Sequence, residues 1–372
     1  MESDAQGCDA IVAAWKPLYG DREPLHFGNV LPFGAGGKDP IHGMDLHFNS
    51  KPVPHWHLIT YGFSELWVKE SDDPEVSGYG FELTARVKID VSHGVATRLA
   101  AGDYAICKTG SEDSRARVVP FWAMNCLQNL ARYVFESGNA FDDGHHVDLL
   151  GPMRTDSNTL IRAAAFRLDP VLPPISTPNG SVNFLQLVGL TNDEYEATKD
   201  WNTLSVLNLM AEQDPLLVID LERKSALENP RLRAAIAAGA AREGSSQAYT
   251  MTKGVKWRKA KHLKSEILIL ELPALVVPDV QKMLRARIPF GKPYAVLSGE
   301  VEIHFEPGGS IEWRDDEGAL GIDVSGEWVE AFCNKVRPLR GRYRVWDSPP
   351  FDVIVNPSPI YDQDDKVIRV IG

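Results

Sequence analysis

Residues 79–89 read YGFELTARVKI, and this stretch decides the fold class. Apolar side chains alternate in it with polar ones, Phe81, Leu83, Ala85, Val87 and Ile89 against Glu82, Thr84, Arg86 and Lys88. A period of two residues is typical of a β-strand. We therefore expect a strand with one face on a hydrophobic core and the other face in water.

Further elements are indicated on both sides of this strand. Strand patterns recur at residues 57–68, 161–168, 182–190, 215–221 and 301–305. A helix is predicted from Pro120 to Glu136, with Gly138 just past its end, and an Ala-rich helix is predicted to begin at Asn229-Pro230. Thr191 and Glu194 form a capping-box pattern. Because strands and helices do not alternate regularly, we predict an α+β fold of mostly antiparallel sheets with a few packed helices.

The length of 372 residues indicates two domains. A polar step at Glu212-Gln213-Asp214-Pro215 is the best candidate for the boundary between them. We therefore expect one domain over residues 1–213 and an α+β domain over residues 214–372.

The chain is acidic, with 39 Lys and Arg against 51 Asp and Glu and a net charge of −12. Such a charge argues against nucleic acid and anionic membranes as partners and leaves room for basic proteins. The exception is residues 253–264, KGVKWRKAKHLK. This segment could contact RNA or an acidic partner, or it could be an edge strand on which lysines discourage pairing with other chains.

Membrane and secretion signals are not evident in the sequence. No apolar run reaches the length that spans a bilayer, and the first ten residues, MESDAQGCDA, do not resemble a signal peptide. The four cysteines are scattered and form no CxxC pair. We expect a cytoplasmic protein with reduced thiols and no membrane association.

Two histidine pairs are the candidate sites of chemistry. His55 and His57 share a face if they lie on a strand, so they could bind one metal ion with His304 as a remote ligand, as in cupin enzymes. The alternative is a structural role in hydrogen bonding. His145-His146 follows Asp142-Asp143-Gly144, which is consistent with a structured turn, a recognition loop or a catalytic group. No spacing assembles a nucleophile with its base, and no cofactor is expected.

Several blocks together resemble the suppressor of fused (SUFU) domain family, in a bacterial-type member. They are PHWHLITYGFSEL (54–66), GFELTA (80–85), LQNLARYVF (127–135), GHHV (144–147), TPNGSVNFLQLVGL (177–190) and Trp201-Asn202. The resemblance is close over about residues 8–220. It implies a non-enzymatic binding protein, because the animal relative holds a short extended peptide between its two domains by strand addition.

The resemblance also implies a site. Tyr133 and Phe141 match aromatic positions beside the peptide cleft, and His145 stands where the animal protein has an acidic contact. With Trp201, these residues are the predicted partner-binding site. The bacterial branch implies an immunity protein that neutralises a polymorphic toxin, bound in or near the interdomain cleft. The alternative function is a cupin-like metal-dependent enzyme that uses His55, His57 and His304.

Overall fold

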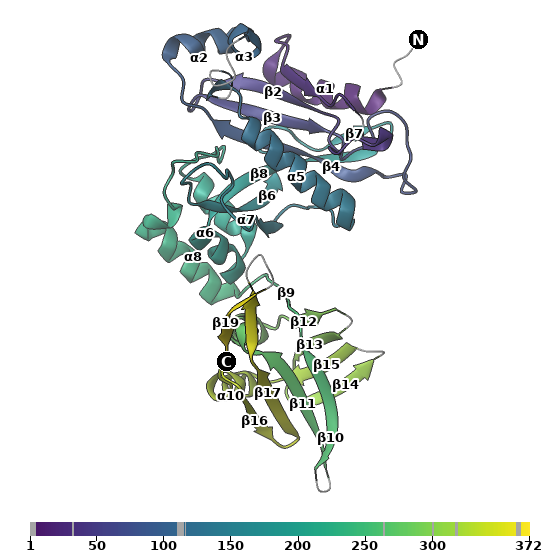
Figure 1. Ribbon diagram of the computed structural model, residues 1–372, viewed down its shortest axis with the longest axis vertical. Helices are drawn as coiled ribbons and strands as arrows, with labels where there is room; N and C mark the ends of the chain where they lie inside the picture. The colour runs from purple at the N-terminus through teal and green to yellow at the C-terminus, as the bar shows by residue number, and fades with distance from the viewer. Residues whose placement is uncertain are drawn as a thin grey trace. The chain divides into compact units, whose positions relative to one another are not determined.

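The computed structural model describes residues 5–31, 33–109, 115, 117–262, 265–299, 301–316, 319–361 and 366–372 (Figure 1). The chain forms two compact units. The first unit comprises Met1–Thr198 and Thr203–Arg233, and the second comprises Lys199–Asn202 and Ala234–Gly372. The first unit thus extends 20 residues past the expected boundary at 213/214.

An open eight-stranded sheet organises the first unit, in the order β1-β2-β3-β4-β8-β6-β5 with β7 paired to β8. Neighbouring strands are antiparallel except β4 and β8, which are parallel. The strands are β1 (Leu25–Gly28), β2 (Gly43–Asn49), β3 (His55–Tyr61), β4 (Val76–Lys88), β5 (His146–Asp148), β6 (Ile161–Leu168), β7 (Ile175–Thr177) and β8 (Gly180–Thr191).

Helices cover both faces of this sheet and follow it in the chain (Figure 1). They are α1 (Gln6–Tyr19), η1 (Phe33–Ala35), α2 (His93–Ala100), α3 (Ala105–Thr109), α5 (Phe121–Ser137), α6 (Asn192–Asp200), α7 (Thr203–Ala211) and η2 (Ala226–Glu228). The next helix, α8 (Pro230–Glu243), begins in the first unit and continues into the second. The predicted capping box is present, since the Thr191 N–H donates to Glu194 Oε2 over 2.8 Å. The α+β fold predicted from the sequence is confirmed.

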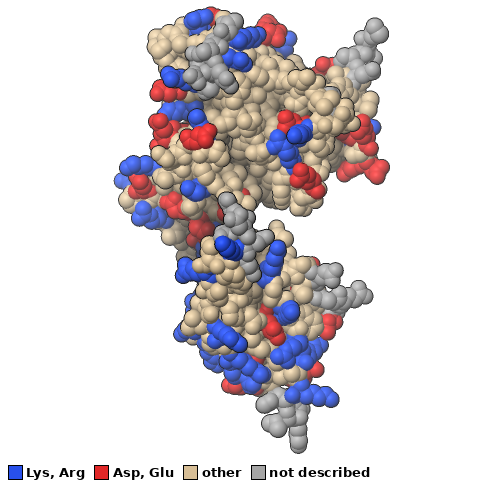
Figure 2. Space-filling model, in the orientation of Figure 1, with Lys and Arg blue, Asp and Glu red and all other residues tan. Residues whose placement is uncertain are grey.

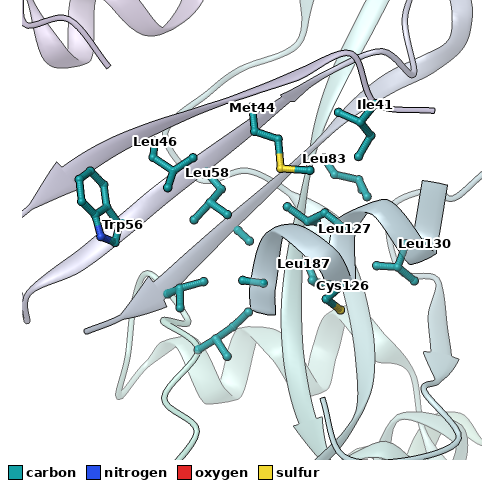
Figure 3. Close-up of a cluster of buried hydrophobic side chains, with 14 of the residues drawn as sticks. Ile41, Met44, Leu46, Trp56, Leu58, Leu83, Cys126, Leu127, Leu130 and Leu187 are labelled. Atoms are coloured by element: carbon teal, nitrogen blue, oxygen red, sulfur yellow. The ribbon is translucent and has the colours of Figure 1, made fainter. Parts of the chain in front are cut away.

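One face of the sheet packs against α5. The apolar stripe of this helix meets the apolar side chains of the central strands in one buried cluster (Figure 3). Leu127, Leu130, Ala131 and Val134 of α5 belong to this cluster, with Leu58, Leu83 and Leu187 from the sheet. The helix ends as predicted, because Gly138 adopts a left-handed φ of 73° and its N–H donates to the Val134 carbonyl.

The opposite face is buried as well, under α1. Ile11 and Trp15 of this helix pack on Ile59, Tyr61 and Phe184 of the sheet. The polar residues of β4 lie on this face, and Glu82, Thr84 and Arg86 are at most 2% exposed. The expectation that this strand has one face in water is therefore wrong.

Hydrogen bonds offset the cost of burying the polar side chains of β4. Glu82 illustrates this: its carboxylate accepts bonds from the Gly62 and Ser64 N–H groups and from the hydroxyls of Ser64 and Thr60. Burial still raises the pKa of Glu82, and the hydrogen bonds from these donors partly offset that effect. The alternation of apolar and polar residues predicted the strand. It did not indicate whether the polar side chains would face water or be buried against hydrogen-bonding groups from other segments.

Residues 215–221 do not form the predicted strand. Ile219 forms only an isolated bridge to Val87: its N–H donates to the Arg86 carbonyl, and its own carbonyl accepts from the Lys88 N–H. Arg223 then pairs with the buried Glu194 over 2.6 Å. These contacts attach residues 203–233 to the first unit, which explains why it extends past the expected boundary.

The second unit contains two main sheets, in the orders β10-β11-β17-β16 and β14-β15-β13-β12-β9, and a β18–β19 hairpin. Its strands are β9 (Tyr249–Met251), β10 (Lys256–His262), β11 (Ser265–Pro273), β12 (Tyr294–Ser298), β13 (Val301–Pro307), β14 (Glu312–Asp316), β15 (Ala319–Val324), β16 (Gly341–Asp347), β17 (Pro350–Asn356), β18 (Ser358–Tyr361) and β19 (Val367–Ile371). The pairs β11–β17, β13–β15 and β9–β12 are parallel, and the others are antiparallel.

The second unit also contains α9 (Val277–Arg287), α10 (Gly326–Lys335), η3 (Ala274–Val276), η4 (Ile288–Phe290) and residues 234–243 of α8. The Trp328 ring lies at the centre of its core, 5.8 Å from Phe305 and 5.2 Å from Phe351 between centroids. The basic strand β10 is a terminal strand, and Lys256, Arg258, Lys259 and Lys261 on it are exposed. For residues 256–262 this placement favours the interpretation as a protected sheet edge, and residues 263 and 264 of the predicted segment lie outside the described residues.

Candidate protein-binding surface

Tyr133 and Phe141 form a ring stack at one side of α5, and only one of the two rings is accessible. Tyr133 is 46% exposed and stacks on Phe141 with centroids 5.8 Å apart. Phe141 is 8% exposed and stacks in turn on Phe166 of β6 at 4.1 Å. Phe141 therefore belongs to the core, and Tyr133 remains as the aromatic side chain that a partner can reach.

His145 lies in a hydrogen-bonded turn immediately before β5. The turn is closed by two contacts, His145 N–H to the Asp142 carbonyl at 3.0 Å and Asp142 N–H to His145 Nδ1 at 3.2 Å. Gly144 adopts a φ of 87° between them, and its N–H donates to the Phe166 carbonyl. The turn presents the exposed His145 side chain at the start of β5.

β5 is the last strand of the eight-stranded sheet, paired on one side with β6. It ends at Asp148, whose carboxylate accepts the Leu150 N–H over 2.8 Å. Leu150 is 92% exposed, which is unusual for a large apolar side chain. We define the β5-edge surface as Tyr133, His145, Asp148 and Leu150. Sequence reasoning missed Leu150, because nothing in the pattern DLLG separates an exposed leucine from a buried one.

Trp201 is part of the second unit's interior. It is 7% exposed, and its indole N–H donates to Glu243 Oε2 over 2.6 Å. Gly239 of α8 makes this packing possible, because a Cβ at that position would lie 2.4 Å from the Trp201 ring. This burial gives Trp201 a structural role and removes its ring from the set of accessible anchors.

The three histidines of the predicted metal site, His55, His57 and His304, each have a ring nitrogen in contact with another group of the protein. His57 Nδ1 lies 2.6 Å from the Tyr19 hydroxyl and its Nε2 lies 3.2 Å from Asp169, while His55 Nδ1 contacts the Val53 carbonyl at 2.7 Å. His304 belongs to the second unit and pairs with Glu302. Within the described ranges, no group of three or more His, Cys, Asp or Glu side chains is placed to hold a metal ion. The sheet carrying His55 and His57 is also open, unlike a cupin barrel.

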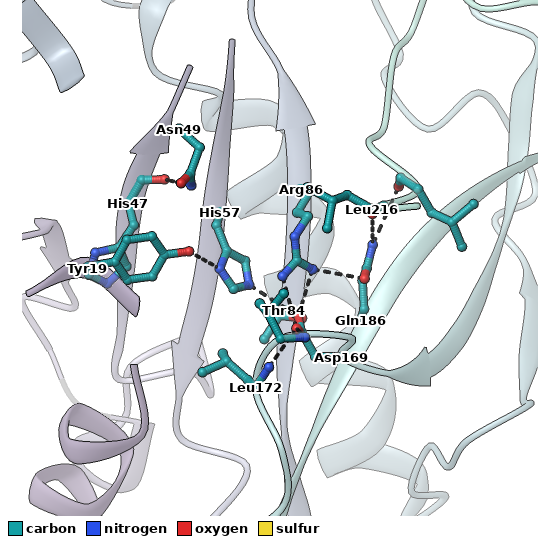
Figure 4. A network of polar contacts seen from close by, with 12 residues as sticks. Tyr19, His47, Asn49, His57, Thr84, Arg86, Asp169, Leu172, Gln186 and Leu216 are labelled. Atoms are coloured by element: carbon teal, nitrogen blue, oxygen red, sulfur yellow. Dashed lines mark hydrogen bonds and ion pairs between the residues drawn. The ribbon is translucent and has the colours of Figure 1, made fainter. Parts of the chain in front are cut away.

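Asp169 is the centre of the buried polar network to which His57 belongs (Figure 4). Its carboxylate pairs with both terminal nitrogens of Arg86, at 2.8 and 2.9 Å, and accepts the Thr84 hydroxyl at 2.6 Å. The N–H groups of Val171 and Leu172 donate to it as well. The network therefore joins β3, β4 and the segment after β6.

The electrostatics of this network hold Asp169 charged and His57 neutral. Burial opposes ionisation of Asp169, but His57 and Arg86 together hold its pKa well below the usual range. Burial and the Arg86 cation lower the pKa of His57 to about 4. His47 lies nearby against the Tyr19 ring, with centroids 4.0 Å apart, and burial lowers its pKa to about 3. These groups are inaccessible, so the network stabilises the sheet rather than forming a reactive site.

The charge of the protein is divided unequally between the units. The first unit contains 19 Lys and Arg against 31 Asp and Glu, and the second contains 20 of each, so the first unit carries the entire net charge of −12. On the visible face of the second unit, Lys and Arg side chains predominate (Figure 2). Among the helices of the described residues, none combines the length and apolar character needed to cross a membrane.

Comparison with known proteins identifies relatives in animals. Suppressor of fused homologs from Homo sapiens and Mus musculus are each 30% identical over 259 residues, which cover 64% of this chain and 48% of theirs. The chain thus spans about half the length of the curated relatives it matches.

Solved structures match over similar or longer ranges. The crystal structure of Drosophila Suppressor of Fused is similar in fold, with a TM-score of 0.78 at 19% identity, over 95% of this chain and 97% of that one. The Sufu-Fu complex crystal structure matches with a TM-score of 0.53 at 27% identity, over 62% of this chain and 97% of that one. The family model described as Suppressor of fused protein (SUFU) matches residues 37–224, about half of the chain. This chain therefore belongs to the suppressor of fused family.

Proposed function

We propose that this protein is a non-enzymatic protein-binding module whose partner binds the β5-edge surface. The observation that carries the proposal is a terminal strand, β5, with two exposed apolar side chains in its surroundings. Leu150, at 92% exposure, lies two residues past the end of β5, and Tyr133, at 46%, stacks on Phe141, which in turn stacks on Phe166 of the neighbouring strand β6. Aromatic and aliphatic anchors of this kind dominate the energetics of interfaces. A solved relative, the Sufu-Fu complex, is itself an assembly of two proteins, which supports a binding function for this chain.

The proposed mode of recognition is addition of an extended segment to the edge of the sheet. A terminal strand offers main-chain groups on its outer side, and main-chain hydrogen bonds supply affinity that is independent of sequence. Specificity would come from two exposed side chains: Tyr133, whose hydroxyl lies 3.5 Å from Asn139 Nδ2, and His145. The expectation that the partner binds in or near an interdomain cleft stays a prediction.

We further propose that the protein is a bacterial-type immunity protein, located in the cytoplasm, whose partner is a basic toxin. The charge of the first unit supports this class of partner. An excess of 12 acidic groups on the unit that carries the β5-edge surface accelerates encounter with a cationic protein. Toxins that cleave nucleic acid bind phosphate and are often basic. A basic toxin gene next to the gene for this chain, or co-purification of such a toxin, would support the proposal.

Substitution at the β5-edge surface tests the site. In the full chain, Tyr133→Ala combined with His145→Ala should weaken binding of the co-purified partner by about 2 kcal/mol, roughly 30-fold, because interface anchors are lost. The melting temperature should fall only slightly, since both side chains are exposed and the turn bond that His145 Nδ1 accepts from the Asp142 N–H is exposed as well. Isothermal titration calorimetry and thermal denaturation measure the two effects.

Phe141→Ala is the matched control for this experiment. Its ring is buried between Tyr133 and Phe166, so truncation should cost about 3 kcal/mol of stability and lower the melting temperature. Unchanged partner affinity in the Tyr133 and His145 double variant would place the site elsewhere. A purification from the native host that returned only metabolic enzymes would count against the toxin proposal.

A further inference from the structure

A second surface of the first unit is hollowed and aromatic. A groove of about 720 Å³ lies where η1, the loop between β3 and β4, and the C-terminal half of α5 meet. We call it the aromatic groove and define it by its ring-bearing residues, Phe33, His42, Phe63, Trp67, Tyr79 and Phe135. Its volume is within the range of ligand-binding clefts, roughly 300–1,000 Å³.

Phe135 organises the rings on one wall. Its centroid lies 5.5 Å from Phe33, 6.2 Å from Phe63 and 5.0 Å from Tyr79. On the other wall, the Trp67 ring meets His42 edge to face at 4.7 Å. Three apolar residues of the groove remain open to solvent, Phe33 at 39%, Trp67 at 46% and Val68 at 57%. Large exposed apolar side chains that share one hollow are typical of binding sites.

The loop that carries Trp67 is held in place rather than free. The Glu65 carboxylate accepts the N–H groups of Glu70 and Ser71, at 2.7 and 2.5 Å, and pairs with Lys69 at 3.1 Å. The Leu66 carbonyl accepts the Gly7 N–H at the start of α1 over 2.9 Å. The groove is therefore formed before any partner arrives, which lowers the entropic cost of binding.

The loop that forms one side of the groove is acidic. Glu70 lines the groove, Asp72, Asp73 and Glu75 follow it in the same loop, and all four are exposed. We call these four carboxylates the acidic rim. The basic residue of this loop, Lys69, is neutralised by its ion pair with Glu65. Both the carboxylates and the faces of the aromatic rings attract cations.

We propose that the aromatic groove is a second protein-binding site, which takes a segment with one large apolar side chain flanked by Lys or Arg. The acidic rim selects this occupant over a purely apolar molecule, for which charged neighbours are of no benefit. The groove is separate from the β5-edge surface, because Phe135 and Tyr133 are two residues apart on α5 and therefore project about 160° apart around the helix axis. This proposal does not depend on the proposed function.

Short labelled peptides test the groove directly. The probes are three synthetic sets with a central Leu, Phe or Trp and flanks of Lys and Arg, of Asp and Glu, or of Ser and Gly. Fluorescence anisotropy with the full chain at low salt should show the basic set binding about tenfold tighter than the acidic set. Trp67→Ala should weaken the basic set about tenfold with little change in melting temperature, because the indole is a half-exposed anchor.

Matched variants distinguish an effect of the acidic rim from an effect of the protein's overall charge on peptide binding. Glu70→Gln, Asp72→Asn, Asp73→Asn and Glu75→Gln together should abolish most of the preference for basic flanks. The control changes four exposed carboxylates elsewhere, Asp156→Asn, Glu212→Gln, Glu222→Gln and Glu228→Gln, and should preserve that preference. Tyr133→Ala and Leu150→Ala should leave peptide binding unchanged, which distinguishes this site from the β5-edge surface.

Four results would overturn the proposal. The first is that no peptide of the basic set binds with a Kd below about 1 mM. The second is that the rim variant and its control behave alike. The third is equal binding of the basic and Ser/Gly-flanked sets, which would indicate a site for apolar molecules. The fourth is self-association of the chain that Trp67→Ala disrupts, which would assign the groove to a second copy.

Discussion

Asp169→Ala should destabilise the first unit by about 3–5 kcal/mol, because the substitution leaves a buried guanidinium without its counter-charge. Arg86 is 2% exposed, and both of its terminal nitrogens donate hydrogen bonds to the Asp169 carboxylate. The variant also removes the acceptor for the Thr84 hydroxyl and for two backbone N–H groups. Urea unfolding followed by circular dichroism measures the loss.

Two further variants serve as controls for the loss of stability in Asp169→Ala. Asp156→Ala changes an exposed carboxylate and should alter the free energy of unfolding by less than about 0.5 kcal/mol. Arg86→Met combined with Asp169→Leu removes both charges, so it should be less destabilising than the sum of the single variants. A loss below about 1 kcal/mol for Asp169→Ala would show that the network contributes little to the stability of the sheet.

Acidification should unfold the first unit, because its fold buries three histidines, His47, His55 and His57, and burial lowers the pKa of each. The pKa of His57 falls from 6.5 in the unfolded chain to about 4, and that of His47 falls to about 3. A pKa that is lower in the folded state contributes stability above pH 6.5, and this contribution is lost as pH falls toward the folded value. Each group costs about 1.4 kcal/mol per pH unit, so the two together give a slope of roughly 3 kcal/mol per unit between pH 6.5 and 4.

His47→Phe tests the assignment of this slope. The Phe ring can keep the stacking against Tyr19 and Trp15, and neither ring nitrogen of His47 has a hydrogen-bond partner to lose. The variant should lower the slope of unfolding free energy against pH below 6.5 by about 1.4 kcal/mol per pH unit, the contribution of one histidine. His93→Gln, at an exposed position, should leave it unchanged. His26 opposes the trend, since its bond to Asp45 raises its pKa. A slope that is the same in the wild type and in His47→Phe would contradict the account.

The sequence predicted those parts of the fold that depend on local pattern. Alternation along residues 79–89 indicated β4, and Pro120 and Gly138 indicated the ends of α5, because strand period and helix caps are properties of neighbouring residues. The burial of Arg86 depends on Asp169, which is 83 residues away in the chain. Local pattern contains no information about such a partner, so the polar face of β4 was assigned to water.

The candidate site was predicted only in part, for a similar reason. An aromatic residue in a polar loop, such as Phe141, is either an anchor or a core residue, and the choice depends on whether a ring such as Phe166 lies beneath it. Trp201 posed the same ambiguity. The residue that permits its burial, Gly239 in an Ala-rich helix, is 38 residues away in the chain, so local pattern could not assign the ring to the core. The aromatic groove was not predicted, because its rings come from segments between Phe33 and Phe135 that only the fold brings together.

Hydrogen exchange of the full chain, alone and saturated with the basic protein that co-purifies with it, tests the central claim most directly. Strand addition at the β5-edge surface should slow amide exchange in residues 144–150 and leave the loop of the aromatic groove, residues 65–75, unchanged. Protection confined to residues 65–75 would instead place this partner in the aromatic groove. Unchanged exchange in residues 144–150 at saturation would contradict the claim that the partner binds the terminal strand of the sheet.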